Sequence, residues 1–141
     1  MRFPTLTPQL VASAHCDLPC GVYDPAQARI EAQSVKAMQE KYQGSDDPVF
    51  KERAIMIIAE RADLVKHHLA VLWHDYFKTP HFEQYPELHG LINDTIKKAS
   101  GTGAKNSVDP ASGQALLDGI DQIATIFWKT KDKEYVLPQS A

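Results

Sequence analysis

Three Asp-Pro pairs divide the sequence and constrain its fold more strongly than any other feature. They are Asp24-Pro25, Asp47-Pro48 and Asp109-Pro110. An aspartate carboxylate accepts hydrogen bonds from the first free N–H groups of a helix, and proline has the backbone angle that the first helical position needs. Apolar residues at helical spacing follow each pair. Each pair therefore predicts the start of a helix.

The apolar spacing predicts four helices. The first follows Pro25 and ends at Gly44, with a stripe formed by Ile30, Ser34, Ala37, Met38 and Tyr42. The second runs from Pro48 to a point before Pro80, and its apolar line includes Ile58, Arg61 and Val65. Another begins near Tyr85-Pro86 and continues to the SGTG segment at residues 100–103. The last follows Pro110 and has the clearest amphipathic face: Leu116, Leu117, Ile120, Ile123, Ala124 and Phe127.

These helices favour an all-α fold. No stretch shows the sustained alternation and hairpin turns that are typical of strands. Mostly short connections predict an antiparallel up-down four-helix bundle over residues 24–131. Residues 132–141 are interpreted as a loose C-terminal tail.

Length and composition exclude several classes of protein. The chain has 141 residues, which is the size of one domain, and its formal net charge is −3. The absence of a basic excess argues against a nucleic-acid partner. The apolar runs are too short to span a membrane, and two cysteines do not make a disulfide scaffold.

Residues 1–14 are interpreted as a removable leader peptide. Ala12-Ser13-Ala14 resembles the small-residue pattern before a signal-peptide cut. The preceding MRFPTLTPQLV has one basic residue, two prolines and no continuous apolar core, which argues against a secretory signal. A short removable leader of another kind, or a plain disordered end, fits this composition better, and we expect a cytoplasmic protein.

Both cysteines fall in the segment HCDLPC, directly after this leader. A disulfide between Cys16 and Cys20 would close a very small loop and stabilise little. Haem attachment needs the order C-x-x-C-H, which is absent, and structural zinc normally takes four ligands from two separated pairs. Two unrelated thiols remain an alternative at this point.

Cleavage before His15 would make a different metal site possible. The α-amine of His15, the amide nitrogen of Cys16 and the Cys16 thiolate can close two adjacent five-membered chelate rings, and Cys20 can supply a second thiolate. The His15 imidazole would lie above this plane of two nitrogens and two sulfurs. Planar nitrogen-rich ligation favours Ni(II) or Cu(II), and the thiolates favour nickel because they tend to reduce Cu(II). Pro19 and Gly21 suit a tight turn.

The segment HCDLPCGVYDP resembles the nickel hook of the nickel superoxide dismutase family. The similarity continues through RADLVKHHLAVLWHDYFKTPHFEQYPELHGLINDT to IFWKTK, so it covers His15 to about Lys131. The resemblance implies a superoxide dismutase with one redox-cycling nickel ion per subunit, a four-helix bundle, a homohexamer and a dedicated leader peptidase. It also implies that the His15 imidazole binds the oxidised metal and leaves on reduction.

The resemblance further suggests roles for residues around the hook, which we take as residues 15–23. Tyr23 and Asp17 would border the approach of superoxide, although Tyr23 is equally suited to packing the hook against the bundle. Glu31 and Arg61 would hydrogen-bond the His15 imidazole, and a partner subunit could supply one of them. An ordinary salt bridge is the alternative, since a charge on the apolar line of Arg61 needs a partner.

Two other functions remain open at this point. A nickel or copper carrier could use the same ligands without redox turnover. A helical interaction module would leave the cysteines incidental. A ferritin-like di-iron protein is disfavoured, because that class needs Glu-x-x-His on two helices and no glutamate here has a histidine three residues later.

Overall fold

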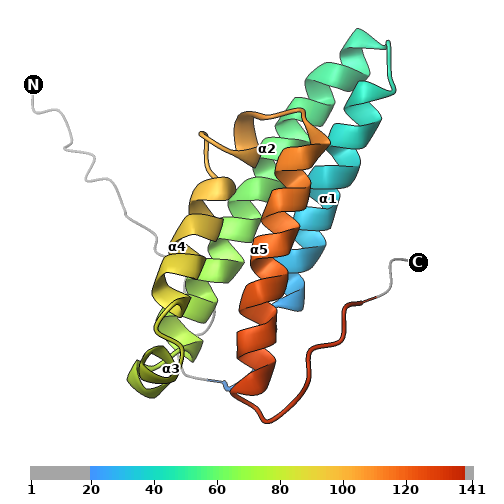
Figure 1. The fold of residues 1–141 in the computed structure, drawn as a ribbon. Coiled ribbons are helices and arrows are strands. Elements are labelled where there is room, and N and C mark those ends of the chain that lie inside the picture. The colour runs from blue at the N-terminus through green and yellow to red at the C-terminus, as the bar shows by residue number, and fades with distance from the viewer. Residues whose placement is uncertain (1–19, 139–141) are drawn as a thin grey trace, which may run out of the picture.

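The computed structural model describes residues 20–138, which form an up-down bundle of four long helices (Figure 1). The chain runs along α1, returns along α2, and then runs up α4 and down α5 (Figure 1). No strand occurs in this part of the chain. The elements are α1 (Ala26–Gln43), α2 (Pro48–Val71), the π-helical turn η1 (Leu72–Tyr76), α3 (Thr79–Gln84), α4 (Leu88–Lys98), the 3₁₀ turn η2 (Ala104–Asn106) and α5 (Pro110–Lys129). The predicted all-α fold is confirmed.

The Asp-Pro pairs begin helices as the sequence predicts. Asp47 accepts a hydrogen bond from the Val49 N–H at 3.0 Å, and Asp109 accepts one from Ala111 at 2.9 Å. Asp24 makes the equivalent contact with Ala26 at 2.8 Å. Each aspartate thus pairs a helix N–H that would otherwise have no partner inside the helix.

The predicted face of α5 is confirmed, whereas that of α1 is wrong. Each predicted α5 residue is buried: Leu116, Leu117, Ile120, Ile123, Ala124 and Phe127. In α1 the buried residues are Ala28, Ala32, Val35 and Gln39, while Ile30 is 59% exposed. The true face was difficult to recognise because small side chains, which allow close helix packing, carry little hydrophobic signal.

The second helix changes geometry before it ends. It is α-helical to Val71 and continues as a π-helical turn to Tyr76, where the N–H of Phe77 donates to the carbonyl of Leu72 at 2.9 Å. Its termination before Pro80 was predicted, but the π turn and α3 were not. Together they form the lower end of the bundle in Figure 1.

Residues 132–138 are not the loose tail expected from the sequence. They turn back from the end of α5 and run beside the bundle (Figure 1). Tyr135 is half-buried, and its hydroxyl donates to Asp121 at 2.7 Å. Among the helices of residues 20–138, none is long and apolar enough to cross a membrane.

Candidate metal centre

The described part of the hook is a short turn that leads into α1. Cys20 is exposed, and the N–H of Val22 donates to its sulfur at 3.4 Å. Gly21 has a φ of +74°, which a residue with a side chain adopts only with strain. A backbone N–H directed at sulfur favours the thiolate, the form of cysteine that binds metals. The turn therefore suits Cys20 as a metal ligand.

Tyr23 joins the hook to the end of the bundle. Its half-buried ring lies 5.6 Å from that of Tyr76, which in turn lies 4.4 Å from the ring of Phe127 in α5. Tyr76 also forms a 2.5 Å hydrogen bond with Thr130. The hook is thus joined to the bundle by a group of packed rings, Tyr23, Tyr76 and Phe127, which we call the aromatic platform. Of the two roles that the sequence suggests for Tyr23, this contact corresponds to packing the hook against the bundle; the other is to border the approach of superoxide.

Glu31 and Arg61 meet between α1 and α2, within one chain. Arg61 Nη1 donates to Glu31 Oε2 at 3.1 Å, and Nη2 donates to Glu60 Oε1 at 2.7 Å. The hydrogen bond that Arg61 donates to Glu31 is the largest cause of the raised pKa of Arg61. The Glu31 side chain is 17% exposed and that of Arg61 is 32% exposed. The salt bridge predicted as the alternative is present, and it leaves open a further contact with His15.

The remaining predicted site residues, His15, Cys16 and Asp17, lie outside the described residues. Within residues 20–138, no group of three or more His, Cys, Asp and Glu side chains could hold a metal ion.

Tyr76, which contacts Tyr23 of the hook, and Lys131, which lies over the Tyr76 ring, were not predicted as site residues from the sequence. Lys131 Nζ lies 5.3 Å from the centre of the Tyr76 ring and 4.9 Å from that of Phe127. A cation over aromatic rings is held by their negative faces. Tyr76 carried a sequence signal only as an apolar position. No local pattern links Lys131 to a segment more than 100 residues earlier in the chain.

Comparisons with known proteins show similarity to one enzyme family. The model of the nickel-containing superoxide dismutase family matches residues 10–131. The superoxide dismutase [Ni] of Streptomyces coelicolor is 66% identical over 124 residues, which cover 88% of this chain and 93% of the relative. The corresponding enzyme of Streptomyces seoulensis is 64% identical over 124 residues with the same coverage.

Solved structures extend the similarity to the fold. A native structure of nickel superoxide dismutase superposes with a TM-score of 0.80 and is 67% identical, covering 84% of this chain and 99% of the other. A structure with nickel ligation corresponding to the oxidised state also gives a TM-score of 0.80, at 64% identity and with the same coverage. The chain therefore belongs to the nickel-containing superoxide dismutase family, and it is a nickel-dependent oxidoreductase.

Proposed function

We propose that this chain converts superoxide to dioxygen and hydrogen peroxide at a hook exposed by cleavage before His15. One nickel ion per subunit would be held by the α-amine and imidazole of His15, the amide nitrogen and thiolate of Cys16, and the thiolate of Cys20. The observation that carries the proposal is the exposed Cys20 turn, with the Val22 N–H directed at sulfur and Gly21 in a left-handed conformation.

The donor set fits nickel chemistry. Thiolates and a deprotonated amide donate electron density to a metal. A set of nitrogen and sulfur ligands favours nickel over Cu(II), because thiolates tend to reduce Cu(II). The nickel ion held by these residues would supply one-electron Ni(II)/Ni(III) chemistry, in which one superoxide is oxidised to dioxygen and a second is reduced, with two protons, to hydrogen peroxide. The His15 imidazole would be a further nitrogen ligand, able to bind the metal and to leave it.

The surrounding side chains would orient the hook and admit the substrate. Tyr23 anchors the hook through its ring contact with Tyr76, and a phenol at the mouth of the site can also hold water or a small anion. Asp17 would border the same approach. The Glu31–Arg61 pair would direct the His15 imidazole, as hydrogen-bonded neighbours of metal ligands commonly do.

The leader of residues 1–14 would block the site until a peptidase removes it. Before cleavage the nitrogen of His15 is a peptide amide, whereas afterwards it is an amine with an ordinary pKa of about 7.7–8.0, able to bind metal. We place this maturation in the cytoplasm, because the leader has no continuous apolar core.

We also propose that the mature chain forms a homohexamer. Several large apolar side chains of α1 and α2 are exposed in the single chain, namely Ile30, Val49, Ile55 and Met56. Apolar residues that gather on a surface commonly mark a site of association. Sedimentation of the mature protein tests this assembly.

The decisive experiment compares Cys20→Ser with the parent protein. We expect nickel content and superoxide decay activity to be abolished while helical circular dichroism is retained, because Cys20 lies outside the packed core. Ser34→Ala, on the surface of α1, is the control and should keep both nickel and activity. Full activity of Cys20→Ser would exclude the proposed ligand set.

The maturation step needs its own test. Ala14→Pro should block the cut and yield a folded protein without nickel. Intact mass of the active parent should correspond to a chain beginning at His15. A fully active chain that still begins at Met1 would contradict the proposal.

A further inference from the structure

The C-terminal segment 132–138 contacts the bundle although it lies beyond the family similarity. The family model ends at Lys131. The native structure of nickel superoxide dismutase is matched along 99% of its length by 84% of this chain. The contacts of residues 132–138 are therefore a feature that the family assignment does not explain.

A specific helix ending directs this segment back along α5. The N–H of Lys133 donates to the carbonyl of Trp128 at 2.9 Å, and that of Asp132 donates to Lys129 at 3.0 Å. Asp132 has a φ of +55°, the left-handed conformation that this pair of hydrogen bonds requires. The chain consequently reverses direction within a few residues and returns toward the start of α1 (Figure 1).

Tyr135 attaches the segment to both α5 and α1. Its hydroxyl donates to Asp121 Oδ1 at 2.7 Å, and the same oxygen accepts from Arg29 Nε at 2.8 Å. The Arg29 and Asp121 side chains are only 12% and 22% exposed. Burial, followed by the neighbouring Asp121, raises the pKa of Tyr135, so the phenol stays protonated and continues to donate at neutral pH.

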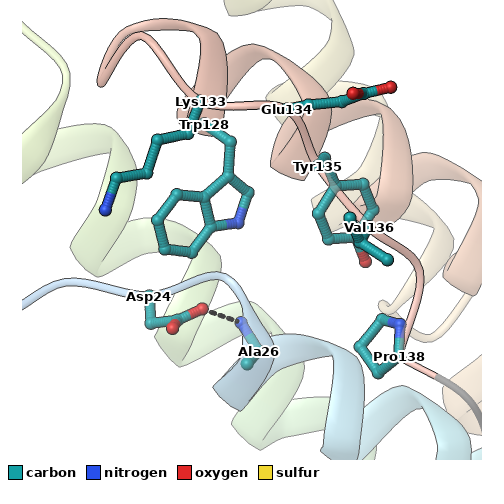
Figure 2. Close-up of a pocket in the computed structure, with 8 residues that line it drawn as sticks. All are labelled: Asp24, Ala26, Trp128, Lys133, Glu134, Tyr135, Val136 and Pro138. Atoms are coloured by element: carbon teal, nitrogen blue, oxygen red, sulfur yellow. Dashed lines mark hydrogen bonds between the residues drawn. The ribbon is translucent and has the colours of Figure 1, made fainter.

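The attachment lies next to the base of the hook. Arg29 belongs to the first turn of α1, and its N–H donates to the carbonyl of Pro25 at 3.1 Å. A hollow of about 400 Å³ separates Asp24 and Ala26 from the returning segment, with the Trp128 indole between them (Figure 2). Lys133 Nζ lies 5.8 Å from the centre of that ring.

We propose that residues 132–138 form a strap that fixes the start of α1 against α5 and thereby positions the hook. Tyr135 is its positioning residue, acting through Asp121 and Arg29. Because Cys20 lies only a few residues before this first turn, movement of the turn relative to α5 would also shift the position of Cys20. The inference rests on the proposed function, since it assumes that the hook holds nickel.

The test measures nickel retention and local motion in the nickel-loaded protein. Tyr135→Phe removes only the anchoring hydroxyl. Tyr42→Phe is the matched control, because it removes the same group at the opposite end of α1, where the ring lies 4.9 Å from Lys51 Nζ. We expect Tyr135→Phe to accelerate nickel release to a chelator about three- to tenfold, as for the loss of one hydrogen bond, and Tyr42→Phe to leave it unchanged.

Amide hydrogen exchange separates positioning from general stabilisation. Exchange in Tyr135→Phe should accelerate at residues 26–30 but not at residues 37–43 of the same helix. Uniform acceleration along α1, or unchanged nickel release, would overturn the proposal. A chain truncated after Lys131 should show a larger effect of the same kind, whereas truncation after Pro138 should show none. If the shorter chain does not fold, Tyr135→Phe still decides the question.

The Cys20→Ser variant distinguishes the two proposals. If it loses nickel while Tyr135→Phe behaves like the parent, only the strap is rejected. If Cys20→Ser retains nickel, the proposed ligand set fails. Exchange at residues 26–30 still reports whether the strap holds α1.

Discussion

Arg61 is a charged residue on an otherwise apolar helix line, and its environment explains why it is tolerated there. One guanidinium nitrogen binds Glu31 and another binds Glu60, at 3.1 and 2.7 Å. Glu60 is the more exposed partner, with 63% of its side chain accessible against 17% for Glu31. Solvent screening weakens exposed pairs more than partly buried ones. Glu31 is therefore the partner whose loss should matter more.

Glu31→Gln tests this residue while preserving the shape of the side chain. We expect activity to fall by about 10- to 100-fold, the usual effect of losing a neighbour that orients a metal ligand, with helical content unchanged. The measurements are superoxide decay, nickel content and circular dichroism. Glu40→Gln is the control, since Glu40 forms an exposed pair with Lys36 on the same helix, at 3.6 Å. Equal activities of the two variants would count against an orienting role for Glu31.

At the level of elements, the long helices are joined by polar contacts as well as by their apolar faces. Lys105 of η2 reaches Asp63 of α2 at 2.6 Å. Gln39, buried in α1, donates to the carbonyl of Ser107 at 3.0 Å and to the Ser112 hydroxyl at 2.9 Å. These contacts hold the connection between α4 and α5 against the rest of the bundle.

The ion pair between Asp63 and Lys105 should make a contribution to the free energy of unfolding that depends on pH. The hydrogen bond from Lys105 is the largest cause of the lowered pKa of Asp63. At pH values between the lowered pKa of Asp63 in the folded protein and its ordinary pKa in the unfolded chain, the unfolded chain binds more protons than the folded one. The stabilisation from the pair is therefore present above about pH 4 and declines as the pH falls. At neutral pH we expect Lys105→Met to lower the free energy of unfolding by roughly 0.2–1 kcal/mol, because the pair is partly exposed.

Denaturant unfolding at pH 7 and at pH 3 checks this expectation. The difference between Lys105→Met and the parent should shrink at the lower pH. Lys98→Met is the control, because Lys98 makes no ion pair with another residue in the described range 20–138. A difference that is the same at both pH values would mean that Lys105 contributes through packing alone.

At the level of the whole molecule, the bundle depends on close approach between helices. A Cβ atom at Gly113 of α5 would lie 2.8 Å from the Lys36 backbone Cα of α1 and 2.5 Å from Gln39 Oε1. The backbone cannot move aside locally without separating the two helices. By contrast, a Cβ at Gly90 of α4 would meet no atom of the described residues within 4 Å. The same substitution should therefore have opposite effects at these two positions.

Gly113→Ala should lower the free energy of unfolding by about 1–3 kcal/mol, because it overpacks the contact between α1 and α5. Gly90→Ala should raise that free energy by about 0.5–1 kcal/mol, because alanine is the better helix former. Denaturant unfolding of each single variant measures both effects. A stabilising Gly113→Ala would show that the two helices can separate without cost.

The sequence by itself determined the features that depend on neighbouring residues. Asp-Pro pairs placed three helix starts to within a residue or two, and the apolar spacing of α5 identified its buried face, because capping and periodicity are local. The composition and order of HCDLPC likewise led to nickel through the ligands that six adjacent residues can offer. These signals need no information about the rest of the fold.

The tertiary structure decided whatever depends on residues distant in the chain. It selected the small-residue face of α1, because close packing of helices rewards alanine where hydrophobicity alone favours isoleucine. It also brought Tyr76 beside Tyr23 of the hook, placed Lys131 over the Tyr76 ring, and joined Tyr135 to Arg29 through Asp121. Such contacts arise only when the helices pack together, since hydrogen bonds and ring contacts depend on distance in space and not on separation in sequence.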